Sequence, residues 1–348
     1  MTTPRILLVG GGSTGHLAPL VAVWREIEKL EPSAKVFALA TDRGTDAAFL
    51  AREKIPYALA PYPWRTLWLP WSLARGFWRA AGVLQAFRPT TVLSKGGLVS
   101  LPVCLLAALR RVPIVVHESD AVMGGGTSLV RRLAHTVCLG IDSGLRSPNT
   151  VVTGNPVRPE ITAGSRERAL QATGLEGKKP ILLVTGGSQG AEAVNRALIA
   201  ALPQLLPTMD VIHLTGPGKS AAPAQAGYFS APHSGDAMGD FYAAAALSLM
   251  RGGAGSISEC AATGTPAVIV PLEGLAHDHQ LKNAERAAVG GGCVLLRQRD
   301  LERLPETLLG LIGNEAKLRD MRTAVRGLQS PEAARLIAGL VLKAGAAR

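Results

Sequence analysis

Residues 5–16 of the chain read RILLVGGGSTGH. The run from Arg5 to Val9 is short and apolar, and the three glycines after it interrupt regular structure. A continuous apolar run of this length is typical of a strand buried on both faces in a parallel sheet. A long amphipathic helical pattern follows the glycines. Strand, glycine turn and helix together predict the opening of a βαβ unit.

The same unit returns in the second half of the chain. Residues 6–13 read ILLVGGGS, residues 181–188 read ILLVTGGS, and a long amphipathic helical pattern follows each. A glycine turn lets backbone N–H groups approach a ligand, and the helix N-terminus behind it favours a negative group. We therefore expect two such units, facing each other across a cleft, to make a place for a diphosphate.

Short β-branched or leucine-rich runs alternate with helical patterns along the whole chain, which predicts a doubly wound α/β fold. In the first half the expected strands are residues 5–9, 35–40, 57–60, 91–93, 113–116, 136–138 and 150–152. In the second half they are residues 181–184, 211–214, a weak strand near Tyr228, 247–250, 267–270 and 293–295.

The length of 348 residues fits two domains of roughly 150 to 200 residues each. Residues 153–159 read TGNPVRP, and the two prolines and the glycine stop regular structure there, as expected of a linker. We therefore predict one domain over residues 1–157, a second over residues 158–328, and a C-terminal helix over residues 329–348 that packs back on the first domain.

Composition excludes several classes of protein. Hydrophobic residues make up 47% and charged residues 18% of the chain, which leaves no room for a long disordered tail. The longest apolar stretch, Leu98–Leu109, is about half a membrane span, and Met1–Val9 lacks an export signal. The cysteines form no Cys-x-x-Cys pair, so we expect a reducing cytoplasm with neither a disulfide framework nor a zinc site. They are Cys104, Cys138, Cys260 and Cys293.

The positive charge lies mainly in the first half of the chain. The formal net charge is +11, and residues 1–160 carry most of the excess of Lys and Arg over Asp and Glu. A basic domain suits nucleic acid, anionic lipid or phosphorylated substrates equally well. A solvated basic surface without a partner is the alternative, so charge alone does not choose among these functions.

The first glycine turn also fits a dinucleotide-binding fingerprint. Gly10, Gly12 and Gly15 have the GxGxxG spacing, with Asp42 at the end of the next strand as a possible ribose ligand. A nicotinamide-dependent protein is therefore a rival hypothesis. Against it, Asp42 comes well beyond the usual distance of about 20 residues, and His16 occupies the helix start.

A third glycine turn lies at residues 251–259, which read RGGAGSISE. Ser256 and Glu259 have the spacing of a capping box, in which each side chain satisfies a backbone N–H of the helix start. The functional alternative is that the N–H groups of Gly255 and Ser256 bind a phosphate, while Glu259 accepts hydrogen bonds from ribose hydroxyls.

A His-x-His pair, His277 and His279, follows in the segment HDHQ. Successive side chains on a helix diverge by about 100°, so the two rings would not share a face. No third ligand is indicated by the sequence, and no metal site is predicted.

Four of the five tryptophans lie between Trp64 and Trp78. Helical spacing places Trp71, Ala74, Phe77 and Trp78 on one apolar stripe, with Arg75 and Arg79 at its border. Tryptophan beside arginine suits a lipid headgroup interface, so docking on a membrane is expected. Packing of the stripe into the domain's own core is the alternative.

Six short motifs of this chain resemble those of the MurG family, the bacterial N-acetylglucosaminyltransferases that convert lipid I to lipid II in peptidoglycan synthesis. They are residues 11–16 (GGSTGH), 95–97 (KGG), 117–118 (HE), 154–158 (GNPVR), 186–191 (GGSQGA, with Asn195 after it) and 278–284 (DHQLKNA). The resemblance covers nearly the whole chain, with the motifs in the right order.

The resemblance implies a GT-B fold, two Rossmann-like doubly wound domains facing across a cleft. It also implies an inverting transfer of N-acetylglucosamine from UDP-N-acetylglucosamine to lipid I, an undecaprenyl-linked acceptor. The first domain would bind the acceptor and the membrane, and the second the UDP-sugar. The protein would be peripheral, on the cytoplasmic face of the membrane, with no nucleic-acid partner. A GT-B enzyme acting on another glycolipid is the alternative.

The resemblance also implies the donor site. Ser188 and the backbone at Gly255 and Ser256 would hold the diphosphate, with Arg158 in support, and Glu259 would bind the ribose. His279 and Gln280 would form hydrogen bonds with the hydroxyl groups of the donor sugar. Helix N-termini and Arg158 can neutralise the leaving diphosphate, so no cofactor is expected.

On the acceptor side, the substrate-binding residues implied by the resemblance are Ser13, Thr14, Gly15, His16 and Asp120. Inverting transfer needs a base for the acceptor hydroxyl, and His16 is the first candidate because its ordinary pKa suits proton transfer at neutral pH. Asp120 and Glu118 are the other candidates. A structural role for His16, hydrogen-bonded to its loop, is the alternative.

On the donor side His279 stands where the family often has glutamine, and on the acceptor side the chain departs from the family pattern at three places. Ser13 and Thr14 replace the usual Thr and Gly, Leu98 stands where Tyr is common, and Ser119-Asp120 replaces the usual Gln-Asn. Asp120 introduces a carboxylate where an amide is usual, so more than one residue remains a candidate for the base.

Overall fold

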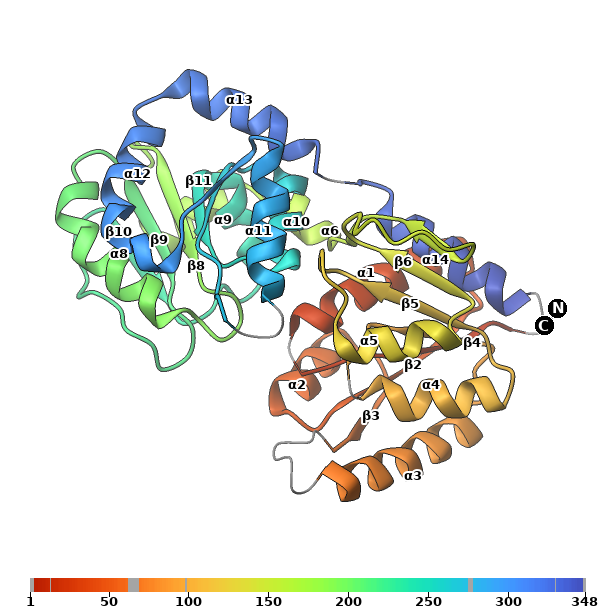
Figure 1. Cartoon of the computed structure of the whole chain (residues 1–348). Helices are drawn as coiled ribbons and strands as arrows, with labels where there is room; N and C mark the ends of the chain where they lie inside the picture. Colours follow the sequence, from red (N-terminus) through yellow and green to blue (C-terminus); the bar gives the residue numbers. More distant parts are fainter. Residues whose placement is uncertain are drawn as a thin grey trace. The chain divides into compact units, whose positions relative to one another are not determined.

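Parallel strands in two separate sheets form the framework of the chain in its computed structural model (Figure 1). The structure describes residues 3–12, 14–61, 69–97, 99–274, 278–328 and 330–346. The chain divides into two compact units: unit 1 is Met1–Pro156 with Ser330–Arg348, and unit 2 is Val157–Gln329. Every strand expected from the sequence is present, and the predicted ends differ from the observed ones by two residues or fewer.

The sheet of unit 1 has the strand order β3-β2-β1-β4-β5-β6-β7. Its strands are β1 (Arg5–Val9), β2 (Lys35–Thr41), β3 (Tyr57–Ala60), β4 (Thr91–Ser94), β5 (Ile114–Glu118), β6 (Thr136–Leu139) and β7 (Thr150–Val152). The helices of unit 1 are α1 (Thr14–Leu30), α2 (Gly44–Arg52), α3 (Leu69–Phe87), α4 (Ser100–Leu109), α5 (Gly125–Val130), the short 3-10 helix η2 (Arg131–Leu133) and α14 (Ala333–Ala346).

Helices cover both faces of this sheet, because successive residues of a strand point to opposite faces. Ile6 and Leu8 of β1 pack in one core with α1 and α14, whereas Leu7 and Val9 pack in another with α3 and α4. The last helix of the chain, α14, lies beside α1, the first (Figure 1). Its Ile337 belongs to the same core as Ile6.

Unit 2 repeats the arrangement with the strand order β10-β9-β8-β11-β12-β13. Its strands are β8 (Ile181–Thr185), β9 (Asp210–Leu214), β10 (Tyr228–Ala231), β11 (Ala245–Met250), β12 (Ala267–Ile269) and β13 (Cys293–Leu295). The helices are α6 (Pro159–Thr162), α7 (Arg166–Thr173), α8 (Glu192–Leu205), α9 (Met238–Ala244), α10 (Ala254–Thr263), α11 (His279–Val289), the 3-10 helix η4 (Gln298–Arg303), α12 (Leu304–Ile312) and α13 (Glu315–Arg326).

The two faces of this second sheet are also both covered. Leu182 and Val184 of β8 pack in a core with α8 and α12, and Ile181 and Leu183 pack in a second core with α9 and α10. The prediction of doubly wound parallel sheets is therefore confirmed.

Strand order reverses at one place in each sheet, and this positions the candidate site. β1 lies between β2 and β4, and β8 lies between β9 and β11. In open parallel sheets ligands bind beyond the carboxyl ends of the strands at such a switch point, because the loops diverge there. The relevant loops follow β1 and β4 in unit 1, and β8 and β11 in unit 2.

Helix α3 carries the apolar stripe with Trp71 and Trp78, whereas Trp64 and Trp68 of the same tryptophan-rich segment lie outside the described residues. The other two, Trp71 and Trp78, are 70% and 77% exposed. The alternative that they pack into the core is therefore wrong, since only Phe77 of the stripe is half-buried. None of the helices among the described residues is both long and apolar enough to span a membrane.

Candidate active site

The glycine turn after β1 is held by hydrogen bonds to residues of β2 and α2. Gly12 N donates to Asp46 Oδ2 at 2.7 Å and to Thr41 Oγ1 at 3.2 Å. A Cβ at Gly11 would lie 2.6 Å from Asp46 Oδ2, and its φ of +149° favours glycine. The glycines therefore let the turn pack against β2 and α2, and the Gly12 amide is not free for a pyrophosphate. This argues against the dinucleotide-binding hypothesis for Gly10, Gly12 and Gly15.

His16 lies in the first turn of α1, directly beyond this loop. Its Nδ1 is 2.8 Å from the carbonyl oxygen of Gly11. Because a carbonyl can only accept, Nδ1 must carry a proton, and in the neutral ring the lone pair is then on Nε2. The predicted loop contact of His16 is thus present, and it leaves Nε2 as the nitrogen able to take a proton.

Several charges act on the His16 ring. Although the side chain is exposed, desolvation by the surrounding protein is the largest cause that lowers the pKa of His16. The ammonium of Lys95 lowers the pKa further, whereas the Gly11 carbonyl, Asp120 and Glu118 raise it. The net direction keeps His16 neutral at neutral pH, as a base requires.

Lys95 is a site residue that sequence reasoning missed, although it belongs to the KGG motif directly after β4. It is 5% exposed, and its Nζ donates to Ser119 Oγ at 2.5 Å. Burial lowers the pKa of Lys95, and the carboxylates of Glu118 and Asp120 oppose that effect. Its place directly after the strand-like run of residues 91–93 was the one signal in the sequence that could have drawn attention to it.

Glu118, at the end of β5, holds a loop. It is buried, and its Oε1 accepts from Asp120 N at 3.2 Å while its Oε2 accepts from Gly124 N at 3.1 Å. Both carboxylate oxygens are thus engaged by backbone amides. Asp120 is half-buried on the same loop. Through the hydrogen bond from the Asp120 amide, Glu118 holds the loop that carries Asp120.

The three other residues predicted on the acceptor side are Ser13, Thr14 and Gly15. Ser13 and the side chain of Thr14 lie outside what the structure describes, as does Leu98, one of the departures from the family pattern. Gly15 is exposed in the first turn of α1. In unit 1 the structure therefore brings together His16, Lys95, Glu118 and Asp120.

In unit 2 the loop after β8 carries Ser188. Its side chain is exposed, in a turn that ends where α8 begins at Glu192. A Cβ at Gly190 would lie 2.2 Å from the carbonyl oxygen of Thr215, so this glycine lets the turn pack against the loop after β9. The loop therefore presents Ser188 near a helix N-terminus, where an anion is favoured.

The start of helix α10, after β11, shows that the capping-box interpretation of Ser256 and Glu259 is wrong. α10 begins at Ala254 with Gly253 as its N-cap residue and no side-chain cap. Ser256 is the third residue inside the helix, so Ser256 and Glu259 do not form a capping box. The first backbone N–H groups of a helix have no intrahelical acceptor, and these include the amides of Gly255 and Ser256. Gly255 is exposed, so its amide can meet an anion.

Glu259 lies on α10 and is half-buried. Its Oε2 accepts a hydrogen bond from the hydroxyl of Tyr242 at 3.2 Å. Burial raises the pKa of Glu259, while the positive charge of Arg158 and the Tyr242 hydroxyl lower it. Arg158 is the N-cap residue of α6, and its buried Nε has no hydrogen-bond partner among the described residues. The structure thus brings Arg158 and Glu259 within electrostatic reach of each other.

The start of α11 packs against the loop that precedes α10. A Cβ at Gly252 would lie 2.3 Å from the carbonyl oxygen of Gln280, and Asn283 Nδ2 donates to Gly252 O at 3.0 Å. Gln280 Oε1 accepts from Leu272 N at 3.0 Å, and His279 is half-buried beside it. Gln280 therefore lies beside the glycine turn that leads to Gly255.

No group of three or more metal-binding side chains occurs in the part of the chain that the structure describes, from which His277 is missing.

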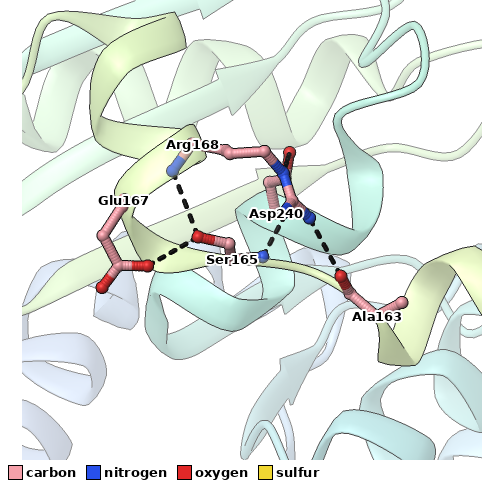
Figure 2. Close-up of polar contacts among 5 residues, drawn as sticks. All are labelled: Ala163, Ser165, Glu167, Arg168 and Asp240. Carbon is pink, nitrogen blue, oxygen red and sulfur yellow. Dashed lines mark hydrogen bonds and ion pairs between the residues drawn. The ribbon is translucent and has the colours of Figure 1, made fainter.

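A charged clasp, built on the ion pair of Arg168 with Asp240, joins helices α7 and α9 (Figure 2). Arg168 on α7 donates to both oxygens of Asp240 on α9, with its Nη2 2.6 Å from Asp240 Oδ1, and also to the carbonyl of Ala163 at 2.9 Å. Ser165 N donates to Asp240 Oδ1 at 2.7 Å. An open cavity of about 600 Å³ adjoins the clasp, lined by Glu160, Ala163, Arg168, Ser234, Asp236, Ala237 and Asp240.

Comparison with known proteins extends over both units. Residues 6–139 match the glycosyltransferase family 28 N-terminal domain, and residues 181–337 match the C-terminal domain of that family. A UDP-N-acetylglucosamine--N-acetylmuramyl-(pentapeptide) pyrophosphoryl-undecaprenol N-acetylglucosamine transferase of Nocardioides sp. is 35% identical, covering 98% of each chain. The protein of the same name from Paenarthrobacter aurescens is 33% identical, covering 97% of this chain and 96% of its own.

Solved structures agree with the fold. The crystal structure of Acinetobacter baumannii MurG has a TM-score of 0.76 at 27% identity and covers 98% of this chain and 99% of its own. The UDP-GlcNAc 2-epimerase from Neisseria meningitidis bound to UDP-GlcNAc has a TM-score of 0.73 at 16% identity, over 97% of this chain, which shows a shared fold alone. The predicted GT-B fold is confirmed.

Proposed function

Because the chain belongs to glycosyltransferase family 28, we propose that it transfers N-acetylglucosamine from UDP-N-acetylglucosamine to lipid I, the undecaprenyl-pyrophosphoryl N-acetylmuramyl-pentapeptide, and so forms lipid II. The observation that carries this proposal is the full-length similarity to transferases of that name, at 35% identity over 98% of both chains for one of them. The similarity extends over both units, which supports assigning a donor site and an acceptor site to this chain.

We assign the donor to unit 2. The amides of Gly255 and Ser256 at the N-terminus of α10, Ser188 after β8, and Arg158 supply the groups that bind a diphosphate. Their positive potential also stabilises the charge that develops on the leaving UDP. Glu259 accepts hydrogen bonds from the ribose, and Gln280 and His279 contact the sugar from the start of α11.

We assign the acceptor to unit 1, with His16 as the base. Its Nε2 takes the proton of the acceptor hydroxyl while the oxygen attacks the anomeric carbon and UDP leaves, which inverts the configuration. The tautomer set by Gly11 and the lowered pKa of His16 both support this role. Desolvation, and after it the charge of Lys95, lower the pKa of His16, while Asp120 acts on the ring electrostatically and is the second candidate for the base.

We further propose that unit 1 docks on the cytoplasmic face of the membrane through α3, where a lipid-linked acceptor is reached. Trp71 and Trp78 are seven residues apart, so they share a face of the helix, and both are largely exposed. Arg75, between them, is exposed as well. Tryptophan and arginine together suit the headgroup layer, and each basic residue near anionic lipid contributes up to about 1 kcal/mol.

The test is a transfer assay with radiolabelled UDP-N-acetylglucosamine and a short-chain lipid I analogue. We expect one labelled disaccharide product with a β-linkage by NMR and one UDP released per transfer. Transfer to a different glycolipid acceptor, but not to the lipid I analogue, would move the chain to another glycosyltransferase activity. Release of UDP without transfer to any acceptor, or sugar epimerisation, would refute the proposal.

A further inference from the structure

The hydroxyl of Tyr242 is an unusual feature of the core of unit 2. Tyr242 is 1% exposed and packs among Ile161, Phe241 and Ile257. A buried hydroxyl must find a hydrogen-bond partner, because burial without one costs free energy. Phenylalanine would fill the same space without that requirement. We therefore look for a role of the hydroxyl other than packing.

The hydroxyl meets one oxygen of Glu259 and also interacts with the thiol of Cys260. Tyr242 donates to Oε2 at 3.2 Å, and no other group among the described residues donates a hydrogen bond to this carboxylate. A carboxylate has two oxygens and about four acceptor positions. The bond to Tyr242 restricts the rotation of the carboxylate while Oε1 keeps its capacity to accept.

The hydroxyl also favours the charged form of Glu259. Burial alone raises the pKa of Glu259, and the Tyr242 hydroxyl and Arg158 act in the opposite direction. A carboxylate accepts stronger hydrogen bonds when it is ionised. Tyr242 thus acts on both the orientation and the charge of the group that we assign to the ribose.

Helix α9, which carries Tyr242, is held firmly from its other side. Asp240 accepts from Arg168 and from the Ser165 amide in the clasp of Figure 2. A Cβ at Gly239 would lie 2.1 Å from the carbonyl oxygen of Glu160, so α9 and α6 are in backbone contact there. Since Arg158 is the N-cap residue of α6, one rigid group of helices supports both Arg158 and Tyr242.

We propose that Tyr242 is a positioning residue for the donor: its hydroxyl holds Oε2 of Glu259 so that the carboxylate meets the ribose hydroxyls of UDP-N-acetylglucosamine in one orientation. This inference rests on the proposed function, because it deepens the role of Glu259 in donor binding.

Tyr242→Phe tests the inference by removing one oxygen atom. We expect KM for UDP-N-acetylglucosamine to rise roughly tenfold with kcat nearly unchanged, as for an interaction made equally in the ground and transition states. Wild-type enzyme should lose affinity for donors that carry 2′-deoxyuridine or 3′-deoxyuridine. That penalty should shrink in Tyr242→Phe, because coupled groups give non-additive effects.

Tyr228→Phe is the matched control. Tyr228 is also buried in unit 2, and its hydroxyl accepts from Ala222 N at 3.2 Å and contacts His213 Nδ1 at 2.8 Å instead of Glu259. This variant should lose thermal stability without a change in donor KM or in the deoxyribose penalty. Equal changes in donor KM for both variants would reduce Tyr242 to a structural role and overturn the inference.

Glu259→Gln separates the inference from the function on which it rests. An unchanged donor KM in this variant would remove the ribose role of Glu259 and the inference with it. A raised KM in Glu259→Gln, beside wild-type KM and deoxyribose penalty in Tyr242→Phe, would leave the ribose role standing and refute the inference alone. Calorimetric titration with UDP at low temperature keeps the comparison possible if a variant has a lowered melting temperature.

Discussion

Replacing both exposed tryptophans of α3, Trp71→Ser with Trp78→Ser, should weaken binding to anionic vesicles severely while leaving folding intact. The two side chains are 70% and 77% exposed. A tryptophan side chain has about 200 Å² of surface, so about 150 Å² of each is open to solvent. If half of that enters the headgroup layer, at about 25 cal/mol per Å², each contributes about 2 kcal/mol. This corresponds to roughly 30-fold in affinity for one tryptophan and several hundredfold for two.

The assay is co-sedimentation with vesicles that contain anionic lipid, beside thermal unfolding of the same proteins. The double variant should lose sedimentation but keep its melting temperature, because substitutions of exposed side chains rarely change stability by more than about 0.5 kcal/mol. Trp24→Ser is the contrasting control, since Trp24 is 6% exposed in the core of unit 1 and its loss should destabilise the fold. Undiminished vesicle binding by the folded double variant would refute the reasoning.

Three further predictions concern the chemistry in unit 1. His16→Ala should lower kcat by roughly 100-fold or more with UDP binding retained; loss of UDP binding in calorimetry would make His16 a phosphate ligand instead. Lys95→Met removes a charge that lowers the pKa of His16, while Asp120 and Glu118 still raise it, so the acid limb of the kcat profile should move to higher pH; an unmoved limb would contradict this. Asp120→Asn restores the amide usual in the family and should keep most activity, and a collapse of kcat would make Asp120 the base.

The glycine turns illustrate how far local pattern reaches. Glycines between a strand and a helix correctly predicted three turns at the carboxyl ends of β1, β8 and β11. The turns differ in what their amides do, however. At Gly12 the amide is taken by Asp46, a residue 34 positions away, whereas the α10 start carries no side-chain cap. The sequence around each turn does not show whether its amides are free, because the side chain that accepts from the Gly12 amide belongs to another helix.

The candidate residues came from motifs in the loops and helix starts that follow strands. His16, Asp120, Arg158 and Glu259 all follow from such motifs, and their functional roles stay predictions. Lys95 was missed because a lysine in a glycine-rich loop is usually solvated, and nothing nearby in the sequence indicates its burial. Only the packing of β4 and β5 side by side places its ammonium at Ser119.

The sequence by itself determined the strands and the doubly wound class, because apolar periodicity and glycine turns are local properties that each segment carries with it, and its short motifs carried the resemblance to the family. Tertiary structure alone decided the strand order, the tautomer of His16, the engagement of Glu118 by backbone amides and the bond from Tyr242 to Glu259. The physical reason is that burial and hydrogen bonding join groups from different elements. Tyr242 and Glu259 are 17 residues apart on two helices, and their contact exists only when α9 and α10 cover the same face of one sheet.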